Sequence, residues 1–190
     1  HLYWTGTPTG VLTTGAGFSA IAGVPLVLVG FEAYANYKHS FAKPWVAAYR
    51  WPILFFVAVA FWNLVGAGLF GFLINPPLAL YYMQGLNTTP LHGHTALFGV
   101  YGMLGIGLML FCLRGLYDRS LHADRFLKPA FWSLNIGLAM MVFLSLLPAG
   151  IYQAWASMSK GLGYARSPEI IHSPVMETLV WLLVPGDVVF

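Results

Sequence analysis

The chain has 190 residues, of which 58% are hydrophobic and only 8% are charged, and its mean hydropathy is +0.72. A soluble domain is roughly one quarter charged, and a soluble domain with so few charges would expose large apolar patches to water. The net charge of +3 is too small to indicate nucleic-acid binding, and the single cysteine, Cys112, excludes an intrachain disulfide and a thiolate metal cluster. The composition therefore predicts a protein that lies in a lipid bilayer.

Long uncharged stretches indicate several membrane spans. Residues 51–113 contain no Asp, Glu, Lys or Arg, which is far longer than the roughly 20 residues that one span needs. Turn-forming segments at Asn75–Pro77 and Asn87–Pro90 divide this stretch into two. Applied to the whole chain, the same reasoning predicts an all-α, polytopic transmembrane helix bundle of about five spans. They lie near residues 11–35, 51–74, 91–113 and 129–152, and from about 175 to the end.

The two chain ends suggest a piece of a larger protein. His1 is not a start methionine, no signal-peptide pattern precedes it, and residues 175–190 stop inside an apolar run. We therefore expect residues 1–190 to be part of one transmembrane domain that is truncated at both ends.

The basic residues predict the orientation of the spans. The connections after the first and third spans carry seven of them, Lys38, Lys43, Arg50, Arg114, Arg119, Arg125 and Lys128, whereas the other side has only Lys160 and Arg166. Cytoplasmic loops are enriched in Lys and Arg. The two basic connections are therefore expected to face the cytoplasm, and His1 and the other two connections to face outside.

The most informative motif is His92-Gly93-His94, at the outer start of the third span. Two residues on a helix are separated by about 200° of rotation, so the two rings point to opposite sides and cannot easily share one metal. They can instead serve two cofactors, one on each flank, because imidazole is a common axial ligand of haem iron. The alternative is a pair of interfacial histidines bonded to loop carbonyls and water, and the residues alone leave both interpretations open.

Other candidate residues give weaker signals. Glu32 lies near the cytoplasmic end of the first span, where a carboxylate could deliver protons or could simply pair with Lys38 at the interface. The glycines of the second and third spans allow close approach of either a neighbouring helix or a flat cofactor, and helix packing is the simpler explanation.

The sequence PLHGHTALFGVYG at residues 90–102 closely resembles quinol-dependent nitric oxide reductases, members of the haem–copper oxidase superfamily. The resemblance extends to HLYWTGTP at residues 1–8, FWNL at 61–64 and VPGD at 184–187, and it covers essentially the whole chain. It implies the catalytic subunit of an enzyme of the bacterial inner membrane. Such an enzyme reduces two NO molecules to N2O and water with electrons from quinol, and it can form a homodimer.

The resemblance also implies roles for three histidines. His92 matches the proximal ligand of haem b3, and His94 matches an axial ligand of haem b. His1 matches the second histidine of a pair that binds the non-haem iron FeB. The remaining ligands of FeB and of haem b would lie upstream of this sequence.

Two positions depart from the pattern of this family. Ala22 stands where a glutamate is expected near the binuclear centre, and Leu183 stands where an arginine is expected before VPGD. The quinol-binding residues are not identifiable in this sequence, so the type of electron donor rests on the resemblance alone. Three alternatives stay open: a cytochrome c-dependent nitric oxide reductase, an oxygen-reducing oxidase, or, from another class of protein, a membrane transporter with proton-relay histidines. A haem spectrum separates the first two from the transporter.

Overall fold

The computed structural model describes residues 6–21, 23–40, 43–116 and 124–190, and the regular secondary structure in these ranges is helical throughout. Four helical stretches within them are long and apolar enough to cross a membrane: Thr9–Ser40, Arg50–Ile74, Thr88–Leu116 and Arg125–Lys160. They coincide with the first four predicted spans. The all-α, membrane-spanning fold class predicted from the sequence is thereby confirmed.

Each long stretch is built from consecutive helical segments. The first contains α1 (Thr9–Ile21) and α2 (Gly23–Ser40), and the second contains α4 (Arg50–Trp62), η1 (Asn63–Phe70) and α5 (Gly71–Ile74). The third contains α7 (Thr88–His94), η2 (Thr95–Gly102) and α8 (Met103–Leu116), and the fourth contains α9 (Asp124–Met140), η3 (Met141–Leu146) and α10 (Leu147–Lys160). The η segments are π-helical, a widened form that often marks functional regions of helices.

The fifth predicted span is two short helices, so the expectation of one continuous helix was wrong. α13 (Pro174–Trp181) and α14 (Val184–Val189) are separated at Leu182 and Leu183. Pro185 lies in the first turn of α14, where its missing N–H costs nothing and where it favours a new helix start. Neither helix reaches the roughly 20 residues of a membrane span.

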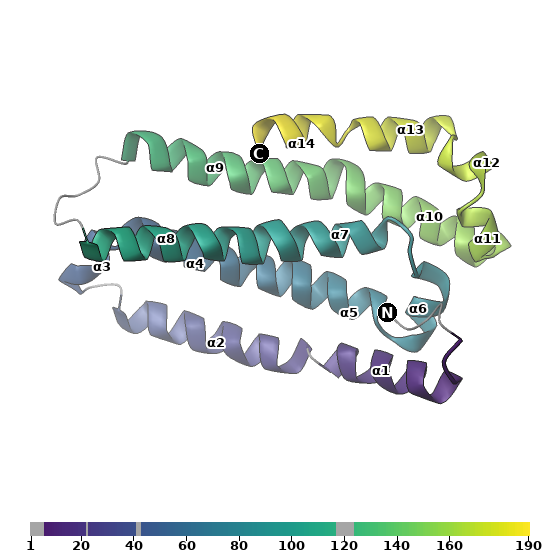
Figure 1. The fold of residues 1–190 in the computed structure, drawn as a ribbon, viewed down its shortest axis with the longest axis horizontal. Helices are drawn as coiled ribbons and strands as arrows, with labels where there is room; N and C mark the ends of the chain where they lie inside the picture. Colours follow the sequence, from purple (N-terminus) through teal and green to yellow (C-terminus); the bar gives the residue numbers. More distant parts are fainter. Residues whose placement is uncertain (1–5, 22, 41–42, 117–123) are drawn as a thin grey trace.

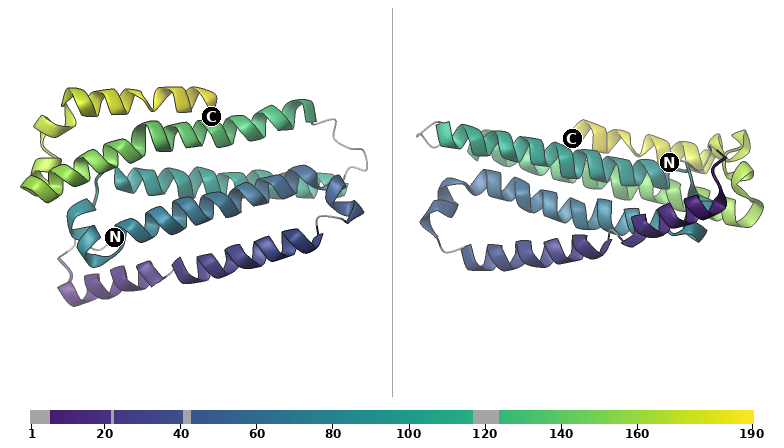
Figure 2. Two further views of the ribbon diagram at one scale, coloured as in Figure 1. Left: turned by 180° about the vertical axis from the view of Figure 1, so that it is seen from behind. Right: turned by 60° about the horizontal axis from the view of Figure 1, so that its bottom comes forward.

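The helices form successive layers, which Figure 1 and the two views of Figure 2 show consistently: α1–α2, then α4–α5 with α7–α8, then α9–α10, and finally α13–α14. The short helix α3 (Pro44–Ala48) lies at the same end of the bundle as the end of α8 and the start of α9. The helices α6 (Pro77–Met83), α11 (Leu162–Ala165) and α12 (Pro168–Ile171) lie at the other end. The grouping of the two basic connections at one end is therefore confirmed.

Small residues let these layers approach closely. A Cβ atom at Gly99 would lie 2.6 Å from the Trp62 side chain, one at Gly107 would lie 2.9 Å from Phe56, and one at Gly66 or Gly68 would overlap Thr95 or Leu26. Helix packing therefore accounts for these four glycines, as the simpler interpretation predicts.

The main core lies between the second, third and fourth long stretches. Trp62 is 2% exposed, and its indole N–H donates to Asn135 Oδ1 at 2.9 Å across two helices. Much of the remaining apolar surface is exposed, including Phe18, Phe31 and Tyr34 on α1 and α2. Such a surface suits lipid or further protein.

Candidate functional site

The two histidines lie in the first turns of the third long stretch. α7 begins at Thr88 with Asn87 as the N-cap residue, two residues before the Pro90 start that the sequence suggested. Pro90 is still within the first turn, where its missing N–H leaves no hydrogen bond unmade. The chain continues as helix through η2 and α8, so both histidines are carried by a long helix that crosses the bundle.

His92 points toward the second long stretch. Its Nδ1 lies 3.0 Å from the carbonyl oxygen of Gly66 in η1. Because a carbonyl can only accept, Nδ1 must carry the proton, and Nε2 presents its lone pair. Metal-binding histidines commonly have this arrangement, in which the second ring nitrogen donates to a backbone carbonyl and fixes the tautomer.

A glycine lies directly against the His92 ring. A Cβ atom at Gly71 would be 3.0 Å from Cε1 and 3.3 Å from Nδ1 of the imidazole. A side chain at position 71 would therefore crowd the ring, which would have to shift by a few tenths of an ångström. Three residues further along the same helix, the buried Thr95 hydroxyl donates to the carbonyl oxygens of Leu91 and His92 at 2.9 and 3.0 Å. The ring of His92 is thus bonded to η1 and packed against α5.

His94 contacts different elements. Its Nδ1 lies 2.9 Å from the carbonyl oxygen of Pro90 in the same helix, and its ring centroid is 5.5 Å from that of Phe98. Phe98 in turn packs against Phe190 at the end of α14, with ring centroids 5.3 Å apart. His94 therefore lies on the flank of the helix that faces α14, whereas His92 faces η1, as the two-residue spacing predicts.

This arrangement limits the kind of metal group that the histidines can bind. No group of three His, Cys, Asp or Glu side chains in the described part of the chain could hold a metal ion. Non-haem metal sites usually need three or more protein ligands, but a haem iron needs only one or two axial ligands. Two imidazoles on opposite flanks of one helix can each offer Nε2 as an axial ligand to a separate haem. His1, the predicted FeB ligand, lies outside the described residues.

The other predicted residues are only partly placed. Ala22 also lies outside the described residues. Glu32 is exposed on α2. Leu183 packs against the main core between α13 and α14.

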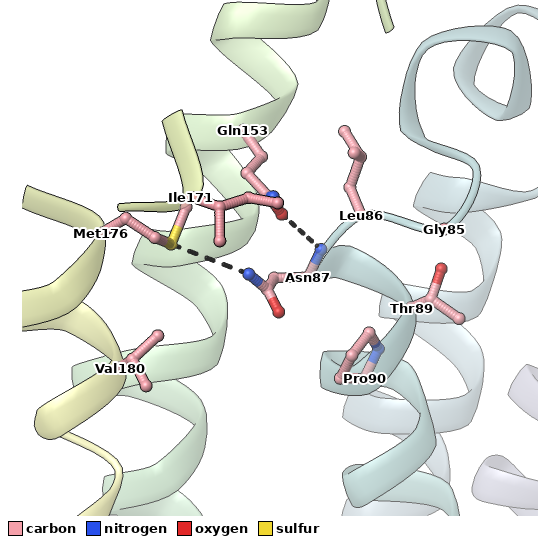
Figure 3. A pocket seen from close by; sticks show the side chains of 9 residues that line it. All are labelled: Gly85, Leu86, Asn87, Thr89, Pro90, Gln153, Ile171, Met176 and Val180. Atoms are coloured by element: carbon pink, nitrogen blue, oxygen red, sulfur yellow. Dashed lines mark hydrogen bonds between the residues drawn. The ribbon is translucent and has the colours of Figure 1, made fainter. Parts of the chain in front are cut away.

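Sequence reasoning missed a polar group at the end of the bundle where α6, α11 and α12 lie (Figure 1). Gln153, an amide in the last helix of the apolar fourth stretch, is 6% exposed, and it bonds the connection that precedes α7. Together with Asn87 and Met176 it lines an open cavity of about 400 Å³ between α7, α10 and α13, which Figure 3 shows. A buried polar residue in a membrane span costs free energy, so such residues usually have a role. A glutamine within an apolar stretch was therefore the sequence signal that could have identified Gln153.

Comparisons with known proteins give the family of the chain. Residues 1–189 match the family described as cytochrome c and quinol oxidase polypeptide I. The chain is also similar to a nitric oxide reductase subunit from Stutzerimonas stutzeri, with 31% identity over 172 residues, which are 88% of this chain and 35% of that protein. The chain thus spans about a third of the length of this relative. It belongs to the family of cytochrome c and quinol oxidase polypeptide I.

Proposed function

We propose that this chain is part of the haem-binding transmembrane domain of a quinol-dependent nitric oxide reductase in a bacterial inner membrane. The enzyme would reduce two NO molecules to N2O and water, with electrons passing from quinol through haem b to haem b3 and FeB. The observation that carries the proposal is the pair of imidazoles on opposite flanks of one membrane helix, His92 facing Gly66 and His94 facing Phe98. The family and the similarity to a nitric oxide reductase support it.

The reaction consumes two electrons and two protons for each pair of NO molecules. Bound haem would supply redox-active iron that accepts electrons and binds a diatomic gas. His92 would hold haem b3 through Nε2, because the Gly66 carbonyl fixes the proton on Nδ1. His94 would hold haem b on the other flank of the same helix. His1 would contribute to FeB, together with ligands upstream of this sequence.

Several groups on this chain would shape the environment of the two haems. The side chains of Trp62, Leu91 and Met103 are buried in the apolar core and would help to keep water out of the bundle. An apolar interior suits a small gas substrate but leaves few groups that can carry protons. Glu32 is the proposed proton-delivering residue of the first span, and its exposed position on α2 leaves it accessible to water or to neighbouring protein.

The proposal is tested by supplying the full-length protein in membranes with a quinol and NO under anaerobic conditions. We expect N2O to form with two NO consumed per quinol oxidised. Equal turnover with reduced cytochrome c would favour a cytochrome c-dependent enzyme, and O2 consumption without N2O formation would favour an oxidase. A protein without any haem spectrum would contradict all three enzyme assignments, the two nitric oxide reductases and the oxidase, and would favour a transporter.

We expect Ala22→Glu to raise NO turnover. Glu32 is ten positions further along the chain, about 15 Å along a helix, too far to replace a carboxylate at position 22 without a chain of water molecules. NO turnover and iron content of the variant and the parent protein provide the measurement. Higher turnover at unchanged iron content indicates proton delivery, whereas equal turnover at equal iron loading contradicts the prediction.

A further inference from the structure

The end of α6 and the connection from it to α7 are fixed by side chains from the fourth long stretch and from the loop after it. We call this arrangement the collar: residues 82–87 with Gln153, Ser157 and Arg166. The Ser157 hydroxyl donates to the Tyr82 carbonyl oxygen at 2.6 Å, and the Arg166 guanidinium donates to the Gln84 carbonyl oxygen at 2.5 Å. The collar therefore attaches the segment before the histidine helix to α10 and to the α11–α12 connection.

Gln153 makes the contact of the collar that lies closest to the histidines. Its Oε1 accepts a hydrogen bond from the backbone N–H of Asn87 at 2.8 Å, and its Nε2 donates to the carbonyl oxygen of Ala165 at 3.3 Å. Figure 3 shows its amide reaching across from α10 to the start of α7. Because the side chain is 6% exposed, both ends of the amide need a partner, and both have one.

The geometry connects this contact to the two imidazoles. Asn87 is the N-cap of α7 and precedes His92 by five residues and His94 by seven, roughly 7 and 10 Å along a helix. Next to it, Gly150 of α10 lies against Thr88, where a Cβ atom would approach the Thr88 backbone nitrogen to 3.0 Å. A helix is stiff over this length. The position of Asn87 along the helix axis therefore sets the axial position of both imidazole rings.

We propose that Gln153 is a positioning residue for the haems: it holds the Asn87 amide and so sets the axial position of His92 and His94. The inference rests on the proposed haem ligation by these histidines. Gln153 touches neither imidazole, and its effect passes through the backbone of α7. Loss of the Asn87 contact would let the helix start shift, which would change the iron–nitrogen geometry at both haems.

The test compares Gln153→Met with Gln153→Glu in the full-length protein. Methionine keeps the approximate volume but removes both hydrogen bonds, whereas glutamic acid keeps the acceptor oxygen and, when protonated, the donor. We expect the Met variant to shift the optical bands and the electron paramagnetic resonance g values of the haems. Because Gln153 acts through the α7 backbone, we expect haem retention to fall by less than the roughly 10-fold that loss of a group bonded directly to a metal ligand costs. The Glu variant is expected to keep the parental spectrum.

The matched control is Ser157→Ala, which removes a collar contact to Tyr82 rather than to α7. We expect it to lower thermal stability without moving the haem bands. A Met variant with parental bands and haem retention would overturn the inference, as would equal shifts in the Met and Glu variants.

A second variant decides the matter if Gln153→Met does not accumulate in the membrane. Gly150→Ala adds a single methyl group against Thr88 and removes no polar contact. We expect it to shift the haem bands in the same way, and unshifted bands would overturn the inference. If the parent protein itself binds no haem, the proposed function fails, which is a result distinct from the failure of Gln153.

Discussion

His92→Ala in the full-length protein is expected to abolish the high-spin haem signal and to lower NO turnover by more than about 100-fold. Loss of an outer partner of a metal ligand typically costs about 10–100-fold, and loss of the ligand itself should cost more. The ring is held by the Gly66 carbonyl and packed on Gly71, and no other histidine lies on this flank of α7. The measurement is anaerobic NO consumption together with the optical spectrum of the reduced protein.

A histidine outside the proposed site provides the control for this variant. His172 is exposed at the end of α12, and His172→Ala should keep both the spectrum and the turnover of the parent. We also expect the low-spin signal to persist in His92→Ala, because His94 lies on the other flank. NO turnover near the parental rate in His92→Ala would show that the assignment of the proximal ligand is wrong.

His94→Ala is expected to remove the low-spin haem signal and to block reduction of the remaining haem by quinol. The ring contacts Phe98 and thereby Phe190 at the end of α14, a side of the helix that His92 does not reach. If haem b passes electrons from quinol to haem b3, its loss leaves the second haem present but isolated from the donor. Stopped-flow reduction by quinol, followed at the haem bands, measures this directly.

Chemical reduction shows whether His94→Ala fails because the electron path from quinol is lost or because the protein is generally damaged. Dithionite should still reduce the high-spin haem in this variant, because it does not depend on the quinol path. A high-spin haem that neither reductant reduces would indicate general damage. An unchanged low-spin signal would contradict the role of His94.

Much of the fold could be predicted because membrane spans depend on simple length and charge rules. The uncharged run of residues 51–113 allowed only two spans with a turn between them, and the structure has Arg50–Ile74 and Thr88–Leu116 there. The opposite orientation of His92 and His94 followed from helix geometry alone. The basic residues correctly grouped the connections at one end of the bundle.

The site contacts that the sequence could not predict depend on residues far apart in the chain. The hydrogen bond from His92 to Gly66 joins two helices, and the contact of Gln153 with Asn87 joins residues 66 positions apart. Neither contact follows from a local pattern in the sequence, so a single sequence does not predict it. The break at Leu182–Leu183 was hidden by an apolar sequence that suits a span equally well, and only Pro185 hinted at a new helix start.

The central claim is that one helix carries the ligands of two different haems. The most direct test is the haem content and the spin-state spectrum of the parent, His92→Ala and His94→Ala proteins, measured side by side. The account predicts one low-spin and one high-spin haem in the parent, loss of only the high-spin species in His92→Ala, and loss of only the low-spin species in His94→Ala. Loss of the same species in both variants, or retention of both species in either variant, would contradict it.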